Sequence, residues 1–245
     1  MKGFKNIIIG FVIVNIIWYL ASLLLATNVL QSPFVIYSNL DKLPEELGMH
    51  IISSLKRVGA ALSIALAIGV PTGIFMGRSR ILNKLLDPVI YFLYPIPKTA
   101  LLPVAMLLMG LGDSSKIFLM ILTMVFQIIL AVRDASKNID TAFYDIAVSS
   151  NLSKGYVLKN ITLPAIIPEL FTAIRISTGT AIAILFVVEA YGTRSGIGYY
   201  ILDAWSRISY IEMYGGIVVV SLVGALLFLL IDLLEMLLSP WNKLS

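Results

Sequence analysis

Apolar runs of about 20 residues recur along this chain and constrain its fold more than any other feature. A helix of about 20 apolar residues crosses a bilayer, where only helices and closed barrels can satisfy their own backbone hydrogen bonds. Of the 245 residues, 59% are hydrophobic and 13% are charged, whereas soluble domains carry about 25% charged residues. The sequence therefore predicts an all-α integral membrane protein.

Six membrane spans are expected, and they divide into two parts. They cover residues 7–26, 58–76, 87–109, 116–132, 170–190 and 215–238. The first run is longer than the roughly 7–15 apolar residues of a cleaved signal peptide, which predicts a retained helix. Residues 1–55 are expected to form this helix and an external interfacial segment (31–50). Residues 56–245 are expected to form a core of five helices, with a polar external loop at 191–214.

The distribution of basic residues predicts that both termini are cytoplasmic, since cytoplasmic loops are enriched in Lys and Arg. Ten basic residues then lie inside: Lys2, Lys5, Arg78, Arg80, Lys84, Arg133, Lys137, Lys154, Lys159 and Lys243. Six lie outside: Lys42, Lys56, Arg57, Lys116, Arg194 and Arg207. Lys56 and Arg57, beside the second span, weaken this pattern.

Prolines distinguish the third span from the others. Asp87 followed by Pro88 is typical of a helix start, with a capping side chain and Pro in the first turn. Pro95, Pro97 and Pro103 then predict a kinked or broken helix. A membrane tolerates such a break only where protein or a water-filled cavity satisfies the backbone.

Two ionisable residues are candidates for a translocation path or gate, together with Pro97. Lys98 lies about midway along the third span, where a charge is costly. It either lines the path as a cation for an anionic substrate, or it pairs with Glu169 or Glu189 or extends to an interface. Glu189, at the outer end of the fifth span, is either a gate residue or a helix-end charge.

Three glycines in the second span predict close helix packing. Gly69, Gly73 and Gly77 form a doubled G-x-x-x-G pattern, which places small residues on one helix face. The partner helix lies either within the same subunit, which the pattern favours, or in a second copy at a dimer interface.

The stretch 145–164 is a polar, basic interruption between apolar runs that is expected to form two short helices. Phe143, Ile146, Ala147 and Ser150 recur at helical spacing and predict one small, mostly apolar face. Asn151 tolerates left-handed backbone and is expected to end the first helix. The stretch is too polar for lipid, which favours a docking element at the membrane surface.

Several function classes are excluded or disfavoured by what the sequence contains. It has no Cys and one His, His50, so metal sites, thiol chemistry and a catalytic constellation are not expected. The net charge of +4 is interpreted as a topology signal and not as a nucleic-acid signal. No G-x-x-x-x-G-K-[ST] motif is present, so energy must come from a partner or an ion gradient.

The same stretch resembles the EAA loop of ABC importer permeases, whose pattern is E-A-A, three residues, Gly, nine residues and Ile-x-Leu-Pro. The matching positions are Asp145, Ala147, Ile161, Leu163 and Pro164. Ile146 replaces an alanine and Asn151 replaces the glycine. The nitrate/sulfonate/taurine-type branch is similar over nearly the whole chain beyond the first span, in these motifs and residues: Ser54-Leu-Lys-Arg-Val, Gly69-Val-Pro-Thr-Gly, Asp87-Pro88, Pro95-Ile-Pro-Lys-Thr-Ala-Leu-Leu-Pro, Gly110-Leu-Gly-Asp, Glu189 and Gly196-Ile-Gly-Tyr.

The resemblance implies a six-helix permease of an ATP-driven importer in the cytoplasmic membrane, with a coupling loop at about 138–166. It implies two ATPase subunits that bind ATP and Mg²⁺, an extracytoplasmic substrate-binding protein, a second permease copy and surrounding lipid. The implied coupling residues are Asp145, Ile146, Ala147, Ser150, Asn151, Leu152, Ser153, Leu163 and Pro164. A small anion is the expected substrate, and the alternative is a thiamine-precursor pyrimidine or a riboflavin-like compound.

The alternative mechanism is a transporter driven by an ion gradient. Such transporters often show inverted repeats with broken helices in both halves, whereas only one span here is expected to be broken, which favours the importer.

Overall fold

The computed structural model describes residues 2–25, 27 and 29–240, and every regular element in them is helical. Residue 26, which ends the first expected span, lies outside the described residues, as do Lys243 and the side chains of Lys2 and Lys5. The elements in chain order are α1 Lys2–Leu25, α2 Pro33–Tyr37, η1 Leu40–Lys42, α3 Leu47–Arg78, α4 Arg80–Leu93, η2 Lys98–Leu101, α5 Leu102–Met109, α6 Asp113–Lys137, α7 Thr141–Ser149, α8 Lys154–Val157, η3 Leu158–Thr162, α9 Leu163–Glu189, α10 Ile197–Ser206 and α11 Tyr210–Leu238.

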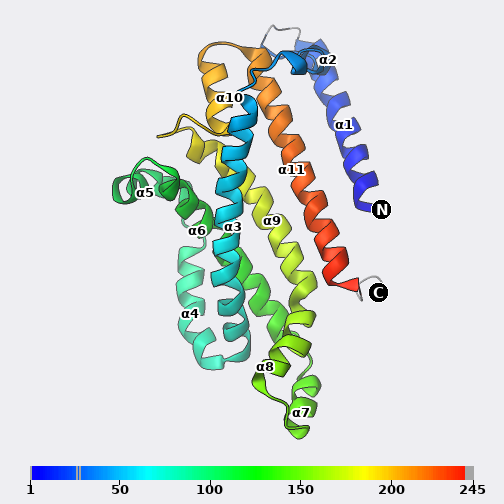
Figure 1. The fold of residues 1–245 in the computed structure, drawn as a ribbon, viewed down its shortest axis with the longest axis vertical. Coiled ribbons are helices and arrows are strands. Elements are labelled where there is room, and N and C mark those ends of the chain that lie inside the picture. The colour runs from blue at the N-terminus through cyan, green and yellow to red at the C-terminus, as the bar shows by residue number, and fades with distance from the viewer. Residues whose placement is uncertain (1, 26, 28, 241–245) are drawn as a thin grey trace.

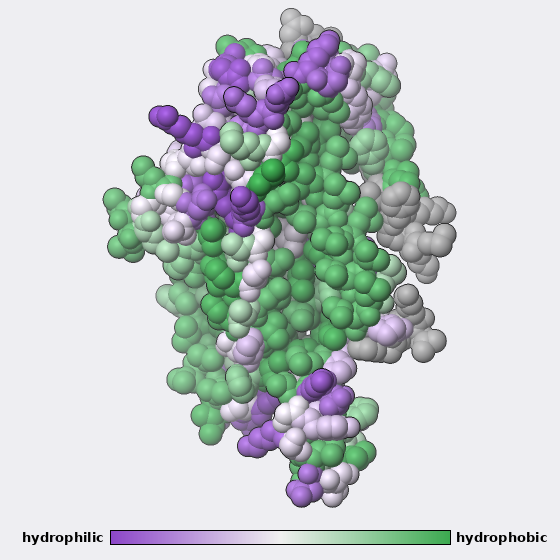
Figure 2. All heavy atoms as spheres, viewed as in Figure 1, coloured by the Kyte–Doolittle hydropathy of each residue, from purple (hydrophilic) through white to green (hydrophobic). Residues whose placement is uncertain are grey.

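The long helices run side by side along the long axis of the molecule, and α1 lies at one side (Figure 1). Five helices are long and apolar enough to cross a membrane, and the bent pair α4 with η2–α5 makes a sixth if it is counted as one span. Figure 2 shows hydrophilic residues gathered at the two ends and a broad hydrophobic surface between them. The predicted all-α membrane fold is confirmed.

The third span is broken, as the prolines predicted, but it begins earlier than expected. Helix α4 starts at Arg80, where the Ser79 hydroxyl accepts a hydrogen bond from Leu82 N (3.3 Å). The predicted helix start at Asp87 and Pro88 is therefore wrong: Pro88 lies inside α4. Because an upstream cap starts the helix, Pro88 removes one backbone hydrogen bond without ending it. After Leu93 the chain bends by 82° into η2 and α5.

The centre of the subunit is the contact between α3 and α6, and the three glycines make it close. A Cβ added at Gly69 would lie 2.8 Å from Ile128 Cγ2, and one at Gly73 would lie 2.7 Å from Val132 Cβ. One at Gly77 would meet Ser136 in the same way. The prediction that these glycines pack within the subunit is confirmed, and they are not available to form a dimer interface.

The expected interfacial segment 31–50 and the expected external loop 191–214 both contain helix. Helix α3 begins at Leu47, so His50 lies in this helix and is buried. The expected external loop 191–214 contains α10, whose apolar side chains Ile197, Tyr200 and Ile201 are buried beside α3 and α11. These residues recur at helical spacing, but the neighbouring glycines favoured a loop in the sequence analysis. Helix α9 also begins before residue 170, at Leu163, directly after the π-helical turn η3.

Candidate functional site

The bend in the coupling segment, residues 138–166, has the structure that the sequence predicted. Asp140 caps α7 by accepting from Ala142 N (2.9 Å). Asn151 has a left-handed backbone (φ 52°), and Leu152 N donates to Ala147 O (2.9 Å). This 6→1 bond after a left-handed residue is the Schellman arrangement that ends helices. The prediction that Asn151 ends the first short helix is confirmed.

The predicted single apolar face of α7 is wrong. Ala147 is 2% exposed and points into the protein, whereas Phe143 and Ile146 point outward and Val148 is 79% exposed. A helix of nine residues with apolar side chains on several sides does not show from sequence which face turns inward. The exposed apolar residues of the segment form what we name the coupling patch: Phe143, Ile146, Val148, Leu152, Tyr156 and Leu158.

Tyr144 holds α7 against two long helices, a role that sequence analysis missed. Its hydroxyl lies 3.1 Å from Thr162 Oγ1, in the turn that leads into α9. The guanidinium carbon of Arg78, at the end of α3, lies 3.2 Å from the centre of the Tyr144 ring. Leu163 and Pro164 lie at the start of α9 and are partly buried. Helices α7 and α8 extend beyond the ends of the long helices (Figure 1), so the patch is displayed outside the apolar band.

At the opposite end, Glu189 is the centre of a buried polar network. Its side chain is 0% exposed and forms an ion pair with Arg57, which is 2% exposed. Ser54 Oγ donates to its carboxylate at 2.9 Å, and Gly198 N donates to Oε2 at 2.9 Å. Arg57 Nη1 also donates to Ser195 O (2.8 Å). Glu189 is therefore not a simple helix-end charge; its role as a gate stays a prediction.

The loop between α9 and α10 is fixed on both sides of this network. Gly196 (φ 117°) leaves no room for a side chain, since an added Cβ would lie 2.2 Å from the Glu189 carboxyl carbon. Gly196 N donates to His50 Nδ1 (3.1 Å). The ammonium of Lys116, which is 0% exposed, donates to Gly192 O (3.2 Å). Arg57 and Lys116, two of the six outer basic residues, are thus buried structural residues.

Lys98 holds the break in the third span. Its ammonium donates to Leu93 O (2.8 Å) and to Tyr94 O, and it lies 5.4 Å from the centre of the Phe126 ring. One hypothesis was that Lys98 pairs with Glu169 or Glu189, but Glu189 pairs with Arg57, and no ion pair joins Lys98 to either glutamate in the described part of the chain. It satisfies carbonyls that the break at Pro95 and Pro97 leaves open. The role of Lys98 and Pro97 in a path stays a proposal.

A second polar cluster joins α9 to α11. Arg175 pairs with Asp232 (2.6 Å) and Glu235 (2.7 Å). These ionisable groups satisfy one another inside the apolar band, as such residues usually do. No group of three His, Asp or Glu side chains in the described residues could hold a metal ion.

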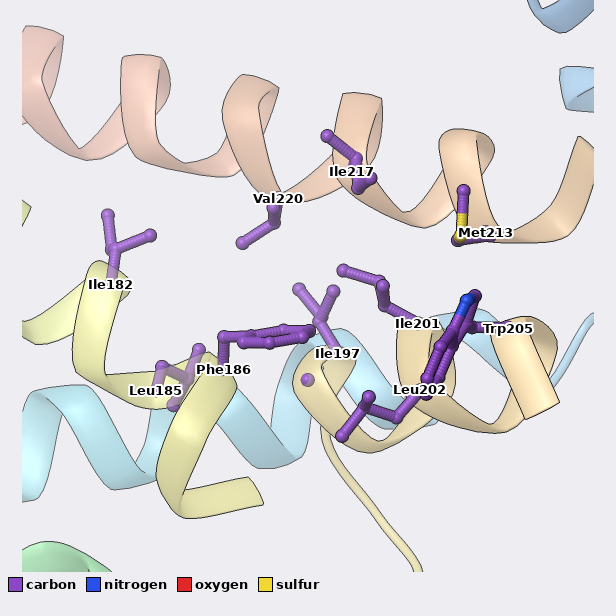
Figure 3. Close-up of a pocket in the computed structure, with 11 residues that line it drawn as sticks. Ile182, Leu185, Phe186, Ile197, Ile201, Leu202, Trp205, Met213, Ile217 and Val220 are labelled. Atoms are coloured by element: carbon purple, nitrogen blue, oxygen red, sulfur yellow. The ribbon is translucent and has the colours of Figure 1, made fainter. Parts of the chain in front are cut away.

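The pocket between α9, α10 and α11 is apolar. Its wall includes Phe186, Ile201, Trp205 and Ile217 (Figure 3), and no charged side chain lines it. The indole N–H of Trp205 is the one side-chain hydrogen-bond donor among these lining residues, so the pocket has no cation to hold an anion.

A comparison with known proteins identifies the family to which these features belong. A family profile described as "Binding-protein-dependent transport system inner membrane component" matches residues 69–243. The chain belongs to this family. It is a multi-pass inner-membrane permease, as the resemblance in its motifs implied.

Three of the permease's relatives are described as import or transport permeases. The taurine transport system permease protein TauC of Escherichia coli (strain K12) is 31% identical over 80% of this chain and 71% of that protein. The nitrate import permease protein NrtB of Synechocystis sp. (strain ATCC 27184 / PCC 6803 / Kazusa) is 31% identical over 79% of this chain and 70% of that protein. The bicarbonate transport system permease protein CmpB of Synechococcus elongatus (strain ATCC 33912 / PCC 7942 / FACHB-805) is 31% identical over 82% and 71%.

Solved structures show the same fold. A chain of the MetNI methionine ABC transporter in an inward-facing conformation aligns with a TM-score of 0.67 at 16% identity, covering 80% of the permease and 99% of that chain. A chain of a bacterial ABC transporter involved in the import of alginate aligns with a TM-score of 0.61 at 16% identity, covering 96% and 98%. The permease therefore has the ABC importer permease fold.

Proposed function

We propose that this permease carries a small oxyanion inward, and that separate ATPase subunits drive it by binding the coupling patch. The observation that carries the proposal is the patch itself: six exposed apolar side chains on a segment outside the apolar band. Apolar surface of this kind on a water-exposed segment marks a protein interaction site. Asp145, Ser150 and Ser153 are exposed beside it and complete the surface.

Tyr144 supplies the route from the patch to the membrane helices. Because this side chain contacts Arg78 of α3 and Thr162 before α9, a displacement of α7 pulls on both helices. Both pack closely on α6. Closure of an ATPase pair would thereby change the tilt of the spans.

The orientation that this proposal requires places α7, α8 and both termini in the cytoplasm. With Arg57 and Lys116 buried in the protein, four of the six outer basic residues remain: Lys42, Lys56, Arg194 and Arg207. The contrast with the ten expected inside becomes stronger, because a buried basic residue in an internal network does not report topology.

The substrate class rests on the relatives, which are described as permeases for taurine, nitrate and bicarbonate. Each of these compounds carries an anionic group of oxygens. We infer that the permease works as a pair of copies with an extracytoplasmic binding protein that selects the substrate, and that ATP and Mg²⁺ bind only to the ATPase subunits.

Reconstitution tests this function. The permease would be assembled in vesicles with its ATPase and binding protein, and ATP-driven uptake of taurine, nitrate and bicarbonate would be compared with uptake of riboflavin. We expect uptake of one of the anions with ATP and none without it. Uptake without any nucleotide, or ATP hydrolysis by the isolated permease, would contradict the proposal.

A further inference from the structure

A groove runs between α6 and α9, from Gln127 near the middle of α6 to Glu169 near the start of α9. Its wall is mostly apolar, with polar side chains among the apolar ones; the lining residues are Tyr94, Gln127, Leu130, Ala131, Asp134, Ala135, Asn138, Glu169, Thr172, Ala173 and Ile176. The exposed face of α11, by contrast, carries Leu222, Leu226 and Leu230. Polar groups facing hydrocarbon are costly, so the groove is expected to face water and the α11 surface to face lipid.

Gln127, near the middle of α6, turns hydrogen-bond donors toward this groove. Its side-chain oxygen accepts from Ser177 Oγ (3.0 Å), and Ser177 is fully buried. Its nitrogen makes one long contact, 3.5 Å to Thr180 Oγ1. A primary amide has two N–H groups. Because the side-chain oxygen already accepts a hydrogen bond and the nitrogen makes only one long contact, the Gln127 amide can still donate a hydrogen bond to a ligand.

Lys98 does not itself line the groove, but it places a cation beside Tyr94, which does. Its ammonium donates to the Tyr94 backbone oxygen and lies 5.6 Å from the centre of the Tyr94 ring. An ammonium has three N–H groups. Those to Leu93 O and Tyr94 O use two of them, which leaves one for a ligand.

Two carboxylates lie at the other end of the groove. Asp134 is paired with Arg133 (2.8 Å). Glu169 is exposed and has no cation within 4.0 Å among the described residues. Its charge repels an anion at short range, so the groove attracts an anion beside Lys98 and releases it beside Glu169.

Resting on the proposed function, we propose that this groove is the surface along which the subunit passes its substrate, with the Lys98 ammonium and the Gln127 amide donating to the oxygens of the anion. The arrangement fits a small oxyanion, which accepts hydrogen bonds and donates few. Thr172, exposed in the wall of the groove, faces the same route.

Charge-selective labelling tests this route without knowledge of the substrate, because the permease has no native Cys. In the complete complex in vesicles, Thr172→Cys would be treated with an anionic ethylsulfonate and a cationic trimethylammonium-ethyl methanethiosulfonate. The rates would be normalised to those of 2-mercaptoethanol. We expect both reagents to react and the anionic one to be preferred.

The same measurement on charge variants isolates the contribution of Lys98. Lys98→Gln should lower the preference on the order of fivefold, as expected for the loss of one nearby charge in a partly hydrated site. Lys56→Gln, which removes an exposed cation from the outer part of α3, should leave it unchanged. Two results would overturn the proposal. The first is no reaction at Thr172→Cys, which would place the groove against lipid or the second copy. The second is a preference for the anionic reagent that Lys98→Gln does not change.

Transport gives a second readout. Gln127→Met should slow anion uptake several-fold while ATP hydrolysis, melting temperature and binding-protein affinity stay near those of the unmodified complex. The matched control is Ser221→Ala, on α11, where the hydroxyl donates to Ile217 O (2.8 Å). Equal uptake in the two variants would contradict a role for Gln127. Absence of uptake by the unmodified complex would contradict the proposed function instead. The labelling result would still show whether the groove is open to water and prefers anions.

Discussion

The two ends of the permease differ in how their side chains are satisfied. At the end that we propose faces outward, named the outer end, Arg57 and Glu189 are almost completely buried, and hydrogen bonds within the chain satisfy them. At the inner end, the coupling patch exposes Phe143, Ile146 and Val148 to solvent. The difference supports the proposal that the side chains of the outer end are satisfied within one chain, whereas the coupling patch at the other end is covered by a partner.

Helix α9 connects these two regions. It starts at Leu163, beside the turn that Tyr144 contacts, and it ends at Glu189. We propose that a motion of the coupling patch would reach the network around Glu189 along this one helix.

The largest loss of stability is expected at the outer network. Arg57→Met leaves the buried carboxylate of Glu189 without its cation, which costs about 3–5 kcal/mol. Unfolding in detergent would measure the loss, and Lys56→Met, at the exposed neighbouring position, is the matched control. A second change, Glu189→Gln, should recover part of the stability. A loss below about 1 kcal/mol would show that the network does not hold the outer end.

A smaller loss is expected in the helix pair that joins the two ends. Gly73→Ala places a Cβ within 2.7 Å of Val132 Cβ and 2.8 Å of Ile129 O, and such overpacking costs about 1–3 kcal/mol. Gly59→Ala, on the same helix with nothing within 4 Å, should be neutral or stabilising, because Ala favours helix by about 1 kcal/mol. Equal effects of the two substitutions on the melting temperature would refute close packing at Gly73.

A still smaller loss is expected where α7 is attached. Tyr144→Phe keeps the ring over Arg78 and removes the hydroxyl beside Thr162, which costs about 1 kcal/mol. Because the patch is unchanged, the ATPase should still bind, while transport per ATP hydrolysed should fall. Full transport efficiency in this variant would show that the contact with Thr162 does not transmit the motion.

The features that the sequence predicted are those that depend on residues close together in the chain. The span positions, the break at Pro95 and Pro97 and the left-handed Asn151 follow from local composition and backbone preference. The pairing of Arg57 with Glu189 joins residues 132 positions apart, and no local pattern indicates it. The inward orientation of Ala147 likewise depends on where α7 rests against other helices.

The most direct test of the account is the binding of the ATPase to a variant of the coupling patch. Ile146→Glu introduces a charge at an exposed position, whereas Ala147→Glu introduces the same charge at its buried neighbour. We predict that Ile146→Glu leaves the melting temperature of the permease unchanged and abolishes co-purification of the ATPase, and that Ala147→Glu lowers the melting temperature. Normal co-purification and transport by Ile146→Glu would contradict the claim that the exposed patch is the docking surface.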